Sequence, residues 1–420
     1  MVEKPYRWSS GATIEEHSLR KHKILREYFF KYLTVRCRLP QQERFRLAIV
    51  DGFAGGGRYS DGQPGSPVIF IEELMRATEA MTVQRAADGM SPISIDCLLV
   101  LNDQSADAVA SLKTHIEPLL GRIKEAVPNL SVRVQYLNKR FEKAYPKIKT
   151  TLTEDRFRNV IFNLDQCGHS HVDRNTLIDI MRSFNSAEIF YTFAIQSLIS
   201  FLQKANPELL EAQLAKVRTT KEDFQKLQVA VNRQAWLGIA ERVVFEAFRT
   251  CAPFVSPFSI HNPDGWRYWL IHFANSYRAR QVYNDTLHSN SSAQAHFGRS
   301  GLNMLSYDPT HEAGALYLFD TLGRQNAKQQ LLEDIPRVVA ESGDAIGVGD
   351  FYEGIYNLTP AHTDDIHSAI MENPDLEVIT PSGGERRKAN TITIEDVIKL
   401  RSQKSFFPVF NSGVSSKKPK

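Results

Sequence analysis

The stretch AIVDGFAGGGRYSDGQPGSP, residues 48–67, places a run of glycines directly after an apolar segment. The apolar residues end at Asp51, and Phe53 and Ala54 come between this acid and the glycines. In open α/β sheets, ligands bind outside the carboxyl ends of the strands. Glycine allows positive φ values and lets a ligand approach the backbone without an intervening Cβ. We therefore expect a buried strand followed by a ligand-binding loop, with a structural turn as the alternative.

Strands and helices alternate on both sides of this loop. Apolar or alternating runs predict strands at 47–50, 97–101, 132–136, 159–164, 188–193 and 267–273. Helical spacing of apolar residues predicts helices at 13–36, 68–77, 105–120 and 172–184. Such alternation favours the α/β class, with a mostly parallel sheet covered by helices on both faces.

The pattern divides the chain into four parts. We expect an N-terminal helical segment at 1–40, a Rossmann-like core at 41–320, a C-terminal winged-helix-like domain at 325–410 and a disordered tail at 411–420. The core carries a helical insertion at about 197–250, where charged stretches with helical spacing replace the strand pattern. The winged helix is expected because two short strands, 376–379 and 391–394, flank the glycine-rich basic turn 381–388.

Composition excludes several classes of protein. Apolar residues make up 42% of the 420 residues, which suffices for a large core and predicts more than one domain. The net charge of +3 permits a nucleic-acid partner without requiring one. The four cysteines form no Cys-x-x-Cys pair, which argues against a disulfide framework. No apolar run reaches the roughly 18 residues of a membrane span and no signal peptide is evident, so we expect a cytoplasmic protein without membrane contact.

The glycine loop does not fit the common phosphate-binding motifs. A P-loop needs Lys and then Ser or Thr after its last glycine, and here Arg58 and Tyr59 follow instead. The pattern Asp-x-Phe-Ala-Gly-x-Gly resembles the first motif of class I S-adenosylmethionine methyltransferases, particularly those acting on nucleobases. The resemblance implies S-adenosyl-L-methionine as the cofactor. The residues it assigns to cofactor binding are Asp51, Phe53, Ala54, Gly55 and Gly57.

A second acid is expected to complete the cofactor site. Asp103 ends the strand 97–101, and a carboxylate there can accept hydrogen bonds from both hydroxyls of a ribose. Asn102 is the less favoured choice. The separation between Asp51 and Asp103 exceeds the usual spacing of about 20 residues in a dinucleotide unit, and we expect an insertion carrying residues 58–66 to account for it.

A wider resemblance covers roughly residues 17–320. The segments His17-Ser-Leu-Arg-Lys-His22, Asp51-Gly-Phe-Ala-Gly55, Gly65-Ser-Pro67 and Tyr268-Trp-Leu-Ile271 are together similar to the three-Cys-motif partner protein family. Membership would imply a methyltransferase-like Rossmann core and a partner protein that carries a three-cysteine motif. It would not specify a substrate.

The residues after the strand 159–164 are the candidates for catalysis. Their position resembles that of the Asp/Asn-Pro-Pro-Tyr motif of amino-methyltransferases. In place of that motif this chain has Asp165, Gln166, Cys167 and Gly168. Asp165 can orient a target amine, with Gln166 adding polar contacts. Alternatively Cys167 is a nucleophile, as in cytosine C5 methyltransferases, which also have Cys in this loop. The alternatives without catalysis are a buried structural Cys167 and a helix-capping Asp165.

The same loop contains a possible metal-binding motif. His169, His171 and Asp173 have the His-x-His-x-Asp spacing of metallo-β-lactamase-like hydrolases, and two imidazoles with a carboxylate suit zinc. The further ligands that such a hydrolase or nuclease needs are not evident in the sequence, and this site would leave the glycine loop unexplained.

Basic residues indicate where a nucleic acid would bind. His17, Arg20, Lys21, His22 and Lys23 cluster on the first helix. Arg386, Arg387 and Lys388 occupy the turn 381–388, where winged helices often contact phosphates. The alternative is a solvated helix face and an ordinary loop. The segment 275–280 follows the strand 267–273 and is expected to border the same pocket as the glycine loop.

The sequence therefore predicts an S-adenosylmethionine-dependent methyltransferase that acts on DNA or RNA. A catalytically silent protein on the same fold, binding nucleic acid or a partner protein, is the second possibility. A metal-dependent hydrolase using His169, His171 and Asp173 is the third.

Overall fold

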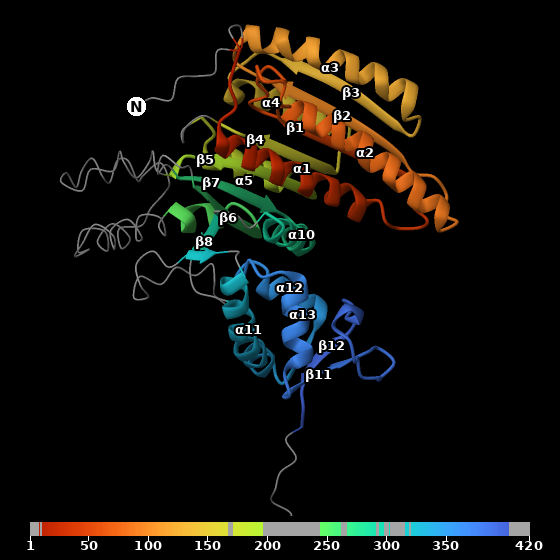
Figure 1. Cartoon of the computed structure of the whole chain (residues 1–420), viewed down its shortest axis with the longest axis vertical. Coiled ribbons are helices and arrows are strands. Elements are labelled where there is room, and N and C mark those ends of the chain that lie inside the picture. Colours follow the sequence, from red (N-terminus) through yellow and green to blue (C-terminus); the bar gives the residue numbers. More distant parts are fainter. Residues whose placement is uncertain are drawn as a thin grey trace, which may run out of the picture.

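A computed structural model describes residues 8, 11–166, 171–195, 244–261, 267–290, 294–297, 302, 316–318 and 321–402. Figure 1 shows a large sheet with helices on both faces, and a smaller unit of helices and short strands next to it. Most of the expected helical insertion, residues 196–243, lies outside the described residues, as does the expected tail at 411–420.

The described residues of the large unit form a nine-stranded sheet in the order β3-β2-β1-β4-β5-β7-β6-β8-β9. Strands β1 to β5 are parallel to one another, and β7 lies antiparallel between β5 and β6. This mostly parallel mixed sheet fits a Rossmann-like methyltransferase fold. The strands are β1 Arg44–Asp51, β2 Ser94–Asn102, β3 Leu130–Leu137, β4 Asn159–Leu164, β5 Ser186–Phe193, β6 Phe254–His261, β7 Arg267–Ala274, β8 Gln294–Phe297 and β9 Leu316–Leu318.

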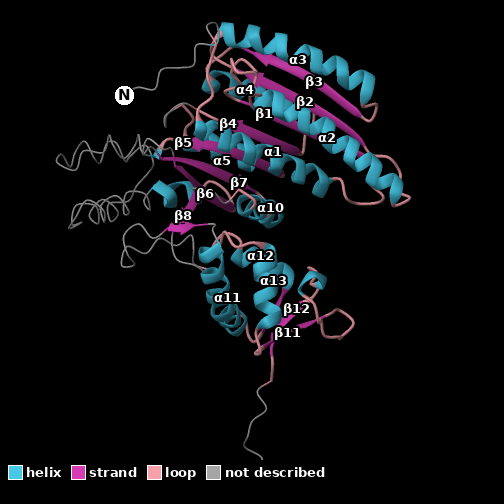
Figure 2. Cartoon of the chain, in the orientation of Figure 1, coloured by secondary structure: helices cyan, strands magenta, loops and turns pink. Residues whose placement is uncertain are grey.

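Two apolar cores lie on the two faces of the sheet, and β1 contributes alternate residues to each. Leu47 and Ile49 join the core under α1, α2, α3 and α10, whereas Ala48 and Val50 join the core under α4 and α5. Both faces are buried, which explains why β1 reads as a continuous apolar run. These helices are α1 Glu16–Arg36, α2 Ser66–Ala87, α3 Ala106–Ala126, α4 Phe141–Glu154, α5 Arg174–Ser183 and α10 Tyr277–His288 (Figure 2).

The smaller unit spans residues 321–402. It contains three helices and an antiparallel sheet in the order β10-β12-β11. Its elements are α11 Thr321–Glu341, β10 Ala345–Gly347, α12 Val348–Ile355, α13 Thr363–Glu372, β11 Leu376–Ile379 and β12 Val397–Leu400.

The prediction of a strand at 391–394 is wrong. Thr391 ends a short 3₁₀ helix, and the strand that pairs with β11 is β12, at 397–400. The side chain of Asp396 accounts for the difference, because it binds the amide of Thr393 at 2.8 Å and pairs with Arg386 at 2.9 Å. These contacts hold 391–396 in a loop although its residues alternate as in a strand.

The segment 275–280 does not border the glycine loop, which is a second correction. Because β7 is antiparallel, its carboxyl end lies at the edge of the sheet where β5 begins. There the Asn275 side chain caps the end of α5 through the carbonyls of Met181 and Phe184. The sequence pattern located the strand correctly but could not specify its direction.

Polar side chains of α10 attach the smaller unit to the sheet. The buried guanidinium of Arg280 donates to the carbonyls of Tyr356 and Thr359, just after α12 ends. Asn284 donates to the carbonyls of Thr359 and Ala361 at 2.9 and 3.3 Å.

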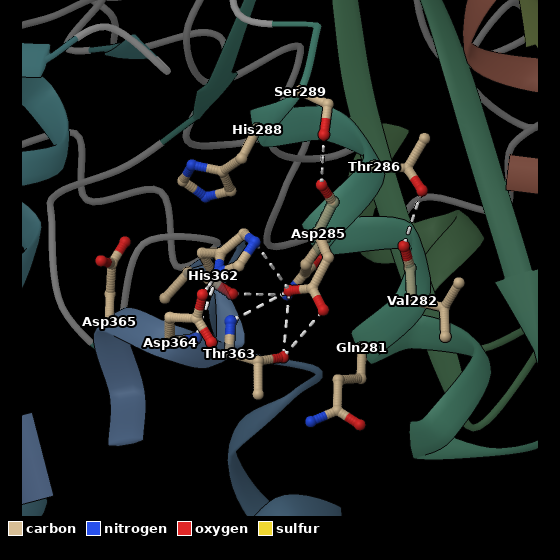
Figure 3. Close-up of polar contacts among 12 residues, drawn as sticks. Gln281, Val282, Asp285, Thr286, His288, Ser289, His362, Thr363, Asp364 and Asp365 are labelled. Atoms are coloured by element: carbon tan, nitrogen blue, oxygen red, sulfur yellow. Dashed lines mark hydrogen bonds and ion pairs between the residues drawn. The ribbon is translucent and has the colours of Figure 1, made fainter. Parts of the chain in front are cut away.

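The start of α13 faces the same helix. Figure 3 shows that Asp285 points toward Thr363, whose amide and hydroxyl both donate to its carboxylate at 2.9–3.0 Å. A carboxylate at a helix amino terminus is electrostatically favourable. The two units therefore share a hydrogen-bonded interface through α10.

Among the helices that the structure describes, none is both long and apolar enough to cross a bilayer.

We expect Asn284→Ala to lower the free energy of unfolding by about 1–3 kcal/mol, because it removes the buried amide that donates to the carbonyls of Thr359 and Ala361, of which Thr359 keeps only the longer hydrogen bond from Arg280. Chemical denaturation followed by circular dichroism measures this. Ser289→Ala, at the exposed residue that follows the end of α10, is the control and should change little. An equal loss in both variants would show that the α10 interface is not a specific source of stability.

Candidate functional site

The candidate site lies where the carboxyl ends of β1, β2, β4 and β5 meet. These strands are neighbours and parallel, so the loops that follow them come together at one edge of the sheet. The loops carry most of the residues that the sequence singled out, and helix α1 lies against them. This is the edge at which doubly wound sheets bind ligands.

Asp51, at the end of β1, is fully buried and has its hydrogen bonds within the protein. Its carboxylate accepts from the Ser66 hydroxyl at 2.6 Å, the Asn163 amide at 3.1 Å and the Phe53 backbone N–H at 3.2 Å. Burial raises the pKa of Asp51 to about 7, although these hydrogen bonds favour the charged form. Asp51 therefore holds the glycine loop, the start of α2 and β4 together, and does not face solvent.

The glycine loop requires glycine for reasons visible in its geometry. Gly55 and Gly57 have φ values of +61° and +87°, in the region that other residues rarely adopt. The backbone N–H of Gly55 donates to Asp103 at 3.0 Å. The carbonyl of Gly56 accepts from Ser111 at 3.1 Å and lies 2.8 Å from a ring nitrogen of His115. Residues after β2 and on α3 thus hold the loop in shape.

Asp103 lies beside the glycine loop, at the position where the sequence predicted an acid. Its second carboxylate oxygen accepts the backbone N–H of Ser105 at 2.8 Å, and burial raises its pKa. Asn102 has a different role, since its amide donates to the carbonyls of Gly52 and Lys139. Ala54 donates to the Asn102 carbonyl at 2.9 Å, which ties the loop to β2 as well.

The indole of Trp8 lies on the face of the glycine loop. A Cβ added to Gly55 or Gly56 would come within 2.4 or 2.5 Å of its ring atoms. The ring also lies beside Tyr59, with centroids 5.4 Å apart. The absence of side chains at these glycines therefore makes room for a flat aromatic group. Nothing in the sequence pattern indicates that this group could be a residue of the chain itself.

Asp165, after β4, forms an ion pair with Lys21 of α1. The Lys21 ammonium donates to both carboxylate oxygens, at 2.6 and 2.8 Å. Burial alone would raise the pKa of Asp165, but the charge and hydrogen bonds of Lys21 outweigh it and hold this pKa below its usual value. The Lys21 side chain is 8% exposed and that of Asp165 27%, so the pair is shielded on the lysine side and open on the other.

Two histidines of α1 accompany this ion pair. Burial lowers the pKa of His22 to about 4, and burial together with the Lys21 charge lowers that of His17 to about 3, so both rings are neutral at pH 7. Nδ1 of His22 is buried and has no hydrogen-bond partner within the described part of the chain. A small cavity between α1 and the strand ends is lined by Lys21, His22, Asn163, Asp165 and Thr192, together with Leu25, Phe190 and Leu270.

Gln166 is buried and has hydrogen bonds on both sides of its amide. Its nitrogen donates to the Tyr191 hydroxyl at 2.7 Å, and its oxygen accepts the backbone N–H groups of His171 and Val172. It thereby joins the loop after β4 to β5. Cys167 lies outside the described residues, so its proposed role as nucleophile stays a prediction.

The possible metal motif is described only in part. His169 lies outside the described residues. Asp173 caps α5 by accepting the backbone N–H of Thr176 at 2.8 Å, and the ring of His171 lies 6.4 Å from that of Phe53. Over the described ranges, no group of three His, Cys, Asp or Glu side chains is arranged to hold a metal ion.

Several residues of the site were not predicted as such. Ser66 and Lys21 belong to the Gly-Ser-Pro and His17–His22 segments that carried the wider resemblance, but the sequence assigned them no contact with Asp51 or Asp165. Asn163 lies inside an apolar strand, two residues before Asp165. A polar residue in a run that is otherwise buried was the available signal.

Comparison with known proteins gives a limited result. No protein-family model matches the chain, and no curated protein matches it. A solved structure of a putative O-methyltransferase from Klebsiella pneumoniae matches with 10% sequence identity and a TM-score of 0.26, over 59% of this chain and 80% of that one. A likeness at this level carries no argument about activity.

The raised pKa of Asp51 predicts a pH-dependent contribution to stability. A carboxyl whose pKa is higher in the folded than in the unfolded protein stabilises most below its unfolded value, and this contribution is lost as the pH rises through the folded value. We expect the unfolding free energy of the wild type to fall, relative to Asp51→Asn, between about pH 4 and 7. Chemical denaturation at several pH values measures this difference.

Asp88→Asn changes an exposed carboxyl and is the control for that measurement. A difference between wild type and Asp51→Asn that does not vary with pH would contradict the raised pKa.

Proposed function

We propose that the chain is an S-adenosyl-L-methionine-dependent methyltransferase whose acceptor is a nucleic acid. The observation that carries the proposal is the arrangement at the carboxyl edge of the sheet. A glycine loop held in the left-handed conformation and the carboxylate of Asp103 lie on one side, and the Lys21–Asp165 pair lies on the other. The glycine loop and Asp103 suit the cofactor, and the Lys21–Asp165 ion pair suits an acceptor group.

The residues present fit the cofactor. The glycine face accommodates a flat ring system, since the indole of Trp8 lies against it. Gly55 and Gly57 would face the cofactor with their backbone, and Asp103 would accept hydrogen bonds from its ribose, after releasing the Gly55 N–H or sharing the acceptor. Asp51, Phe53 and Ala54 would act indirectly by fixing the loop. Trp8 would have to shift to admit the ligand.

When bound, the cofactor supplies an electrophilic methyl group, so the protein's task is positioning and proton removal. The Lys21–Asp165 pair would orient the acceptor through its exposed carboxylate side. Asp165 is a weak base because its pKa is lowered. Burial lowers the pKa of His22 to about 4, so it is also a weak base, and its buried Nδ1, which has no hydrogen-bond partner among the described residues, can accept a hydrogen bond from the acceptor group.

The smaller unit supports the nucleic-acid part of the proposal. Its order of helix, strand, two helices and two strands resembles a winged helix, and the basic turn lies between the last two strands. Arg386 and Arg401 are paired with acids, but Arg387, Lys388 and Lys399 are exposed. The first turn of α13 contains Asp364 and Asp365, and their negative charges would repel the phosphates of a nucleic acid. We therefore propose contact through the turn and not through α13.

Membership of the three-Cys-motif partner family is part of the same proposal. It rests on the His17–His22, Asp51–Gly55 and Gly65–Pro67 segments, of which the site uses Lys21, Asp51 and Ser66. A three-Cys-motif protein would then be an additional partner.

A catalytically silent binding protein is the second candidate. Trp8 fills the face of the glycine loop, and Lys21 occupies the carboxylate that would receive an acceptor amine. If both contacts persist in solution, the loop would serve only to hold the N-terminal segment in place.

We expect S-adenosylmethionine and S-adenosylhomocysteine to bind with micromolar affinity, about −8 kcal/mol, as measured by titration calorimetry. Gly55→Ala should abolish this binding, because the residue has a φ of +61°, which alanine rarely adopts, and its new Cβ would project onto the loop face that receives the cofactor once Trp8 has shifted. Gly121→Ala, at a helical position with open space around it, is the matched control. Absence of binding to folded wild type would favour the silent protein.

We expect methyl transfer to DNA or RNA fragments to fall about 100-fold or more in Asp165→Asn and Lys21→Met, with cofactor binding retained, because these residues position the acceptor. Incorporation of a radiolabelled methyl group measures this. Full activity in Asp165→Asn would remove that carboxylate from the mechanism.

The double variant Arg387→Ala/Lys388→Ala should weaken nucleic-acid binding and reduce the salt dependence of that binding. The double variant Arg122→Ala/Lys124→Ala, on α3, is the control and should do neither.

A further inference from the structure

A second cavity opens at the opposite edge of the sheet. It has a volume of about 150 Å³ and lies between the carboxyl-terminal half of α1, the start of β5 and the start of α10. None of its lining residues belongs to the candidate methyltransferase site, which is at the carboxyl end of β5.

A buried carboxylate forms the inner wall of this cavity. Glu188 is 5% exposed, and its Oε2 accepts from the Tyr28 hydroxyl at 2.5 Å and lies 3.1 Å from Nε2 of His272. Burial lowers the pKa of His272, so both neighbours are neutral donors at pH 7. Over the described ranges, Tyr28 and His272 are the side chains that contact this carboxylate, and neither Lys nor Arg forms an ion pair with it. A buried carboxylate without a cation is costly, and a ligand cation would relieve that cost.

Aromatic groups line the cavity beside this carboxylate. Tyr28 and Tyr32 both contribute to its wall, with ring centroids 6.5 Å apart. The Tyr32 hydroxyl is buried and has no hydrogen-bond partner among the described residues, although the residue is only 4% exposed. Aromatic faces next to a carboxylate favour an ammonium group, and the unused hydroxyl can bond a polar ligand.

The mouth of the cavity has the opposite charge. Arg36 and Arg278 line it and are exposed, and Ser276 is the capping residue at the amino terminus of α10. Arginine side chains and a helix amino terminus both favour an anion. A purely cationic ligand would be repelled at the mouth, and a purely anionic one would be repelled by Glu188.

We propose that this cavity binds a small zwitterion of the free α-amino acid class. Its ammonium group would contact Glu188 between the two tyrosines, and its carboxylate would face Arg36 and Arg278. The volume suits this class, since a cavity of about 150 Å³ accommodates a molecule the size of benzene. The site would place a small-molecule sensor on α1, the helix that also supplies Lys21 to the other edge of the sheet.

The test uses the full chain and the twenty standard L-amino acids, each at millimolar concentration. Thermal denaturation identifies those that raise the melting temperature, and titration calorimetry then gives the dissociation constant of the best one. The corresponding amine without the carboxylate, and the acid without the amine, should each bind more weakly. Glu188→Gln keeps the side-chain shape and an acceptor for Tyr28 but removes the charge, and should weaken binding about tenfold or more.

Arg278→Gln is the second variant, and Arg122→Gln on α3 is the control. Arg278→Gln should also weaken binding, and it decides the test if Glu188→Gln does not fold. The proposal is overturned if no amino acid binds the wild type. It is equally overturned if the dissociation constant is unchanged in a folded Glu188→Gln or, failing that variant, in Arg278→Gln.

Discussion

The burial of one carboxylate, Asp51, is the constraint on which the site depends. It accepts hydrogen bonds from Ser66 at the start of α2, from Asn163 of β4 and from the amide of Phe53. A buried carboxylate needs these donors, and each donor belongs to a different segment. The glycine loop between β1 and α2 is therefore held by the same group that ends the strand. Asp103 then fixes the far side of the loop through Gly55.

Helix α1 connects the two edges of the sheet. Its first half brings Lys21 and His22 to the carboxyl ends of β4 and β5, and its second half brings Tyr28 and Tyr32 to the amino end of β5. The helix runs alongside the strands, from one end of them to the other, and packs against both α2 and α10 (Figure 1). A small shift of α1 would therefore be felt at both places. The helix α10 extends this connection to the smaller unit through Arg280.

Most of the central fold could be predicted because its signals are local. Four of the first five strands contain buried apolar runs and β3 alternates, and the helices between them show the spacing of one apolar face. Prediction failed where a long-range contact overrides the local pattern. The Arg386–Asp396 pair holds 391–396 in a loop, and the antiparallel direction of β7 moves the segment 275–280 to the other edge. Neither the partner of a side chain nor the direction of a strand is contained in its neighbours along the chain.

The sequence by itself determined the alternation of strands and helices, the glycine loop after β1, and the acids that end β1 and follow β2, because each depends on residues close together in the chain. The tertiary structure decided what these residues contact. Asp165 pairs with Lys21, which lies 144 positions earlier, and Trp8 covers Gly55. The buried Glu188 became visible only when Tyr28 and the cavity around it were in place. Such contacts arise from packing, since only the folded chain brings distant side chains within hydrogen-bond distance and removes them from water.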